Sequence, residues 1–254
     1  MPNVIACYKW VIDEADVRIK DDLSVDTSRA QMKISDYDRN AIQAAADAAA
    51  QLGGKVIGLS YGDARLKKSV KEALSRGLDE LVWVNDANAS AADSAVVSQV
   101  LAAAARTQED VQLIVCADGS SDLFARQTAP RIAAQLDWPV VTSVSEMSVE
   151  GGVLKAERPV ADGFEEVEVS LPAVVSVLPE VNEPPIPSLR QVMQAGKKPN
   201  AEVAVADLSI DAASRSSVVD AKGYVMDRKN VVLDGSDENC VSDLMAALRK
   251  EGVL

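Results

Sequence analysis

The chain has 254 residues, of which 48% are hydrophobic and 26% are charged, so it is long enough to bury a substantial core as one domain with an extension or as two domains. Its formal net charge of -13 argues against a nucleic-acid partner, because phosphate contacts need clustered lysine and arginine. The absence of histidine removes the usual general base at neutral pH and every Ser-His or Cys-His nucleophile pair.

Through residue 139, short apolar runs alternate with alanine-rich helical patterns. Strands are predicted over residues 3–11, 55–62, 80–86 and 111–119, and helices over residues 36–54, 64–77, 90–108 and 121–139. Four successive strand-helix units require a parallel sheet that is covered on both faces. We therefore predict an α/β fold with a doubly wound, mostly parallel sheet, Rossmann-like and of the adenine nucleotide-binding type.

The pattern changes after Pro139. Residues 140–152, 153–163, 164–170 and 171–179 alternate apolar with polar side chains, with turns at Gly151-Gly152 and Asp162-Gly163. Such alternation is typical of antiparallel strands. No linker precedes this section, so we expect it to be an added part of the same domain, which would span residues 1–181.

Residues 182–199 are rich in proline and also contain apolar side chains, at Ile186, Leu189, Val192 and Met193. This composition favours a projecting loop that offers an apolar anchor to a partner; the alternative is a plain connection. Residues 200–254 then predict a C-terminal arm with a helix in residues 237–254, capped by Asp237 or Ser236. The arm is expected to lie along a surface that belongs to another chain.

Ligands of open parallel sheets bind beyond the carboxyl ends of the strands. Gly62 and Gly119 follow two of these ends and allow close approach of the backbone. The predicted helix start near residues 121–125 offers backbone N–H groups to an anion, and Gln127 and Thr128 follow within reach of a phosphate or a ribose. Alternatively, the residues from Asp118 onward are only turn and cap residues.

Other candidates are ambiguous in the same way. Asp36 and Asp38 either cap the first long helix or contact a ribose, and Lys9 and Asp13 either contact a cofactor or pair with each other. Neither GxxxxGK[ST] nor GxGxxG occurs. Three widely spaced cysteines indicate reduced thiols and a cytoplasmic protein. The N-terminus reads as a strand and not a signal peptide, and no apolar run is long enough to cross a membrane.

An ordered set of motifs runs through the whole chain: "CYKWVIDEADVRI", "ISDYDRNAIQAA", "KEALSRGLDE", "CADGSSDLFARQTAP", "LDWP", "AERPVADGFEEVEVSLPAVVSV", "NEPPIPSLRQVMQAGKKP" and "LRKEGVL". This set resembles the beta subunit of electron-transfer flavoproteins, and it is most similar to the Fix-type branch. The family signature is matched imperfectly, because Ala161 stands where an acidic residue is usual and Ser176 where Thr, Ala or Cys is usual.

The resemblance implies a heterodimer whose alpha subunit carries the redox-active FAD, while this chain holds AMP or, in electron-bifurcating members, a second FAD. The loop "DGSSDLF" differs from that of ordinary members and leaves this choice open. The candidate cofactor-binding residues are Ala6, Cys7, Lys9, Asp13, Ser35, Asp36, Asp38, Ser60, Tyr61, Gly62, Ala117, Asp118, Gly119, Ser120, Ser121, Asp122, Ala125, Arg126, Gln127 and Thr128. Arg126 takes the place of a residue that is often Asn, and either adds a phosphate contact or points away.

The resemblance also implies partners. Residues 182–198 correspond to the family's recognition loop, with Leu189 as its anchor on an acyl-CoA dehydrogenase or a related dehydrogenase. Electrons would then pass to a quinone oxidoreductase, to ferredoxin or to another acceptor, and this subunit would have no catalytic residues of its own. From the residues alone, an adenine-nucleotide-hydrolysing enzyme or a nucleotide-sensing α/β protein is the alternative.

Overall fold

The computed structural model describes residues 1–224 and 229–254. Its centre is a seven-stranded sheet in which every neighbouring pair is parallel, with the order β14-β7-β6-β1-β8-β13-β9. The strands are β1 (Asn3–Cys7), β6 (Lys55–Gly62), β7 (Glu80–Asn85), β8 (Val111–Ala117), β9 (Val140–Val144), β13 (Ala173–Val177) and β14 (Asn200–Ala204). The predicted α/β fold is confirmed.

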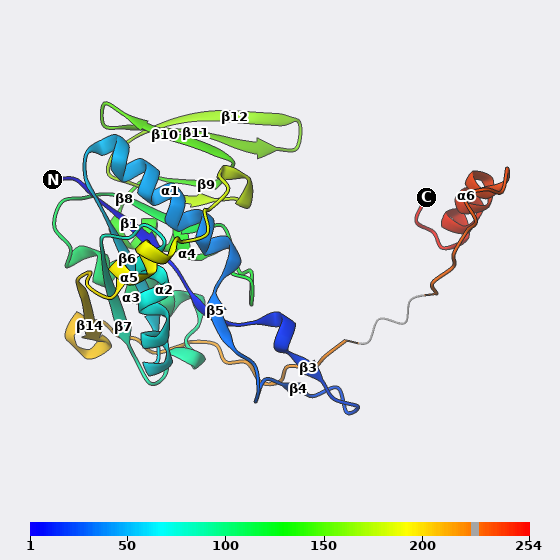
Figure 1. The fold of residues 1–254 in the computed structure, drawn as a ribbon, viewed down its shortest axis with the longest axis horizontal. Helices are drawn as coiled ribbons and strands as arrows, with labels where there is room; N and C mark the ends of the chain where they lie inside the picture. The colour runs from blue at the N-terminus through cyan, green and yellow to red at the C-terminus, as the bar shows by residue number, and fades with distance from the viewer. Residues whose placement is uncertain (225–228) are drawn as a thin grey trace.

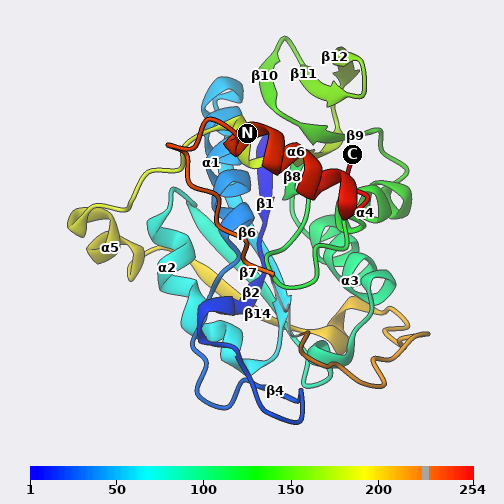
Figure 2. The same ribbon diagram turned by 90° about the vertical axis from the view of Figure 1, so that its right-hand side faces the viewer.

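Helices cover both faces of this sheet (Figures 1 and 2). On one face α1 (Asp36–Leu52) and α2 (Val70–Ser75) bury apolar side chains in one core, and on the other α3 (Ser94–Arg106) and α4 (Thr128–Leu136) do so in a second. Alanines fill much of the buried side of α1 and α3, which lets these helices lie close to the sheet. A short helix, α5 (Leu189–Ala195), packs against α2.

Several predicted elements are shorter than their sequence patterns. The first strand ends at Cys7, and β2 (Trp10–Ile12) instead pairs antiparallel with β5 (Met32–Ile34). The helix predicted from residue 64 begins as a 3-10 turn, and the one predicted from residue 90 begins at Ser94. Smaller elements are β3 (Arg18–Ile19), β4 (Val25–Asp26) and 3-10 turns at Glu14–Asp16, Ala64–Ser69, Ala89–Ala91, Pro179–Val181 and Val205–Leu208.

The section after Pro139 is only partly antiparallel. An antiparallel sheet forms from β10 (Glu146–Glu150), β11 (Val153–Val160) and β12 (Gly163–Ser170), and β10 packs against α1. The predictions for residues 140–144 and 173–177 were wrong about direction, because these segments are β9 and β13 of the parallel sheet. All five residues of β13 are buried, as expected for a strand with a helix on each side.

Residues 205–212 after β14 still pack on the core, and beyond them the chain leaves the body as an arm. Figure 1 shows it in orange, running from β14 toward β3 and β4, while α6 (Cys240–Lys250) stands apart from the sheet. This last helix starts at Cys240 with Asn239 at the N-cap position and no side-chain cap, so the predicted cap at Asp237 or Ser236 was wrong. In the two described segments of the chain, no helix has the length and apolarity needed to cross a membrane.

Candidate functional site

A cavity of about 910 Å³ lies at the carboxyl edge of the sheet, around the ends of β1 and β8. These two strands are neighbours, and the helices that follow them, α1 and α4, lie on opposite faces. This is the topological switch point, where open α/β sheets bind their ligands. The sequence candidates that line the cavity are Cys7, Lys9, Asp38, Tyr61, Gly62, Ala117, Asp118, Gly119, Ser120, Asp122, Ala125, Arg126, Gln127 and Thr128.

The remaining candidates do not line the cavity. Ala6, Ser35 and Ser60 are fully buried beneath it, where the hydroxyl of Ser60 donates a hydrogen bond of 2.6 Å to the Tyr8 carbonyl. Asp13 and Asp36 belong to a surface ion-pair cluster around Lys33. The other candidate outside the lining is Ser121, whose backbone N–H donates to the Ser35 hydroxyl at 3.2 Å.

Two carboxylates hold Lys9 at the cavity wall. Asp38 accepts a 2.7 Å hydrogen bond from the backbone N–H of Lys9, and Asp122 accepts one of 2.6 Å from its ammonium. Burial raises the pKa of Asp38 to about 7, although the Lys9 N–H opposes this. Burial would also raise the pKa of Asp122, but its bonds to Lys9 and Ser120 outweigh burial and lower it. The expected Lys9–Asp13 pair does not form, and neither Asp36 nor Asp38 caps α1.

Arg126 is exposed at the cavity wall, but its guanidinium is paired with a buried carboxylate. Its Nε lies 2.6 Å from a carboxylate oxygen of the buried Asp118, and its guanidinium donates to the Ser143 hydroxyl at 2.8 Å. The other oxygen of Asp118 accepts from the Ser176 hydroxyl at 2.8 Å. Arg126 has a φ of +56°, a conformation that suits Asn better than Arg. The positive charge of Arg126 is therefore matched by Asp118.

The helix after β8 begins at Thr128, so the anion site predicted at residues 121–125 was misplaced. Gln127 is the N-cap residue and gives no side-chain cap; its amide oxygen instead accepts from Nε of Arg131 at 2.9 Å. Within the described residues, the backbone N–H groups of Thr128 and Ala129 have no hydrogen-bond partner and Arg131 has no ion pair. Arg131 lines the cavity beside this uncapped helix start.

The start of α3 is closed by contrast. Asp93, at its N-cap, accepts hydrogen bonds of 3.0 Å from the backbone N–H groups of Ala95 and Val96. Residues 89–95 and 216–218 both line the cavity, and the sequence interpretation missed them. The Asp-Ser pair before the apolar run of α3 is a cap signal that could have placed Asp93 at a helix start, but nothing in the sequence brings residues 216–218 there.

Other polar groups of the cavity lack partners, and its two thiols are buried. The buried indole N–H of Trp10 lines the cavity and has no hydrogen-bond partner, and neither has the buried hydroxyl of Ser121 close by. Cys7 and Cys116 lie on neighbouring strands at the cavity wall, and a hydrogen bond to Cys7 together with burial raises the pKa of the Cys116 thiol. The described residues contain no group of three potential metal ligands.

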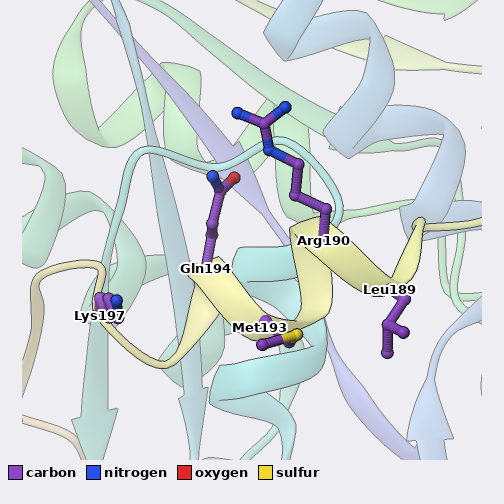
Figure 3. A pocket seen from close by; sticks show the side chains of 5 residues that line it. All are labelled: Leu189, Arg190, Met193, Gln194 and Lys197. Carbon is purple, nitrogen blue, oxygen red and sulfur yellow. The ribbon is translucent and has the colours of Figure 1, made fainter.

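The predicted partner-binding residues lie at a second place, on and before α5. Ile186, Leu189 and Met193 are 94, 76 and 68% exposed, and Val192 is half-buried. A capping box between Ser188 and the residue three positions later fixes the start of α5. Figure 3 shows the Leu189 and Met193 side chains on one side of α5 and those of Arg190 and Gln194 on the other, around a shallow pocket.

Residues 22–208 match the family model described as the electron transfer flavoprotein domain. The match covers most of the chain and includes α1, the loop before α4 and α5.

Proposed function

The chain belongs to the electron transfer flavoprotein family, and we propose that it is the beta subunit of a heterodimer and binds an adenine nucleotide in the cavity at the switch point. The observation that carries this proposal is the uncapped start of α4. Unpaired N–H groups at a helix start, together with the helix dipole, favour an anion. Arg131 adds a positive charge without an ion pair at the same place.

The cavity also fits the rest of an adenine nucleotide. Its volume lies near the upper end of the range for small-molecule sites, which is compatible with AMP and with FAD. The Trp10 side chain lines the cavity and offers an aromatic surface for a base, and the buried Asp38 is an acceptor for a hydroxyl. The phosphate would lie at the start of α4. Arg126, whose charge is matched by Asp118, would hold the loop before α4 in place without contacting the phosphate.

The redox chemistry of this proposal belongs to a flavin. FAD on the alpha subunit supplies one- and two-electron transfer when it is bound, and this chain contributes surfaces that hold the two subunits together. Val241, Leu244 and Leu248 recur at helical spacing on α6, and the first two are exposed. An amphipathic helix that packs on none of the described strands of the central sheet fits an interface with another subunit. We propose that the arm and α6 pack on the alpha subunit.

We further propose that residues 182–198 dock an acyl-CoA dehydrogenase or a related dehydrogenase. The prolines and the capping box stiffen this segment, and Leu189 stands exposed at the start of α5. A preorganised apolar side chain that enters a pocket loses little entropy on binding and is a common centre of binding energy. Downstream, the electrons would pass to a quinone oxidoreductase, ferredoxin or another acceptor.

The native complex, purified without added cofactor, tests the proposal. Heat denaturation should release FAD together with either AMP or a second equivalent of FAD for each chain, and chromatography of the supernatant measures the ratio. Two flavins per heterodimer would identify the electron-bifurcating type. A chain that purifies without a second subunit and without any adenine nucleotide would contradict the proposal.

A further inference from the structure

Asp93 holds two separate parts of the chain, one with each carboxylate oxygen. Its Oδ1 accepts from the backbone N–H groups of Ala95 and Val96 and so caps α3. Its Oδ2 accepts from the backbone N–H groups of Arg215 and Ser216 at 2.9 and 3.2 Å, and from the Ser216 hydroxyl at 3.2 Å. These bonds lower the pKa of Asp93 to about 2, so it is ionised at neutral pH.

A further pair of hydrogen bonds fixes the arm at the same point. The backbone N–H of Asp93 donates to the Ser214 hydroxyl at 3.0 Å, and that hydroxyl donates to the Ala91 carbonyl at 3.1 Å. Residues 214–216, more than 120 positions away in sequence, are thereby joined to the loop that precedes α3. Both segments line the cavity, the loop through residues 89–95 and the arm through residues 216–218.

Among the described residues before 225, the arm is also attached upstream and downstream of this point. Upstream, Leu208, Ile210 and Ala212 pack against the core that contains α3. Downstream, a bridge joins Ser24 to Lys222. Between these anchors the side chains that face the cavity are exposed and make no other described hydrogen bond, so Asp93 is the attachment nearest to the cavity.

We propose that Asp93 is a positioning residue that fastens the C-terminal arm as a strap across the mouth of the cavity and slows exchange between the cavity and solvent. The strap should slow the reaction of thiols inside the cavity with reagents from solvent, whether or not a ligand is bound. The effect on a bound nucleotide rests on the proposed function.

The substitution Asp93→Asn separates the strap from the helix cap. Asn is as good an N-cap as Asp, and its amide oxygen can replace Oδ1 toward Ala95 and Val96. Its NH₂ group replaces Oδ2 and cannot accept from the N–H groups of Arg215 and Ser216. The attachment of Arg215 and Ser216 is therefore lost while α3 stays capped, and only the Ser214 hydroxyl still joins this part of the arm to the loop. Asp63→Asn is the matched control, because Asp63 also lines the cavity and contacts no part of the arm.

Three readouts on the full chain test the strap. In D93N, hydrogen exchange at the Arg215 and Ser216 amides should accelerate on the order of tenfold, since each loses a charged acceptor. Alkylation of Cys7 and Cys116 by iodoacetamide should accelerate several-fold relative to Cys240, which lies on α6 away from the cavity. Dissociation of AMP and of FAD, each tested separately, should also accelerate several-fold. D63N should leave the exchange and alkylation rates unchanged.

The outcomes distinguish the strap from the nucleotide site. If exchange and alkylation in D93N match the wild-type rates, the strap is refuted whether or not a nucleotide binds. Faster exchange with unchanged alkylation refutes it as well, because the arm would then be fastened without covering the cavity. If the wild-type chain binds neither AMP nor FAD, the proposed function fails, and the alkylation rate still decides the role of Asp93.

Discussion

Replacing Asp38 by Asn should change how the stability of the protein depends on pH. Asp38 is only 6% exposed, and burial raises its pKa from 3.8 to about 7 in the folded chain. Between these two values the folded state binds a proton that the unfolded state has released. Folding stability therefore falls as pH rises from about 4 to 7, and it levels off above that range.

The size of the effect follows from the difference in pKa. Linkage gives the loss of unfolding free energy that Asp38 causes, relative to a pH low enough to protonate it in both the folded and the unfolded state. This loss is about 1 kcal/mol at pH 4.5 and about 4 kcal/mol at pH 8. In D38N the side chain is neutral at every pH, and its amide oxygen can still accept from the Lys9 N–H. The variant should therefore gain stability relative to wild type by about 3 kcal/mol between pH 4.5 and 8.

Urea unfolding of the nucleotide-free chain at a series of pH values measures this difference. Using the difference between the variant and wild type removes the contribution of the other carboxylates. Asp47→Asn is the control, because Asp47 lies on the exposed side of the same helix, and its difference from wild type should not change with pH. If the D38N difference is the same at pH 4.5 and 8, Asp38 is not held in a setting that favours its neutral form, and the reasoning is wrong.

Three further substitutions probe the proposed site, the docking segment and the fold. Gln127→Asp would give α4 a cap for the Ala129 N–H. It should therefore raise the melting temperature, measured by scanning calorimetry, and lower the affinity for AMP, measured by titration. If the melting temperature and the AMP affinity both rise, the phosphate does not bind at this helix start. Leu189→Ala should slow reduction by an acyl-CoA dehydrogenase on the order of tenfold while flavin and nucleotide contents stay constant, and an unchanged rate would remove the docking role. Asn40→Ala should cost about 1–3 kcal/mol in urea unfolding, because the buried Asn40 amide donates to the carbonyls of Pro179 and Asn182 at 2.9 and 2.8 Å, and no loss would mean that these carbonyls find other donors.

The sequence predicted the alternation of strands and helices well because buried strands and amphipathic helices differ in period and length. The spacing of apolar residues does not indicate whether a strand is parallel or antiparallel to its neighbours. For this reason β9 and β13 were predicted as antiparallel strands. The continuous apolar run "AVVSV" of β13 was a usable signal, since a strand buried on both faces does not alternate. Its neighbour β9 is partly exposed at the sheet edge and gave no such signal.

The start of α4 was misplaced because tertiary contacts use the residues that resemble caps. Asp122 binds Lys9, and the Ser121 backbone bonds to Ser35, far away in the chain. Phe124 and Arg126 then adopt positive φ values that no helix contains. The local sequence predicted a helix cap at residues that form a loop in the folded chain. The helix starts at Thr128, after the residue whose guanidinium pairs with Asp118.

The two helix starts at the cavity differ in a way that decides which of them can hold an anion. At α3, Asp93 satisfies the N–H groups and places a negative charge in front of them, so a phosphate would meet repulsion and no unpaired donor. At α4, the N–H groups of Thr128 and Ala129 are unpaired and Arg131 supplies a positive charge, while Pro130, the counterpart of Val96, has no N–H to offer. The carboxylate that closes the first helix start to a ligand also binds the arm, so the proposed anion site and the proposed strap attachment lie at two different helix starts of one cavity.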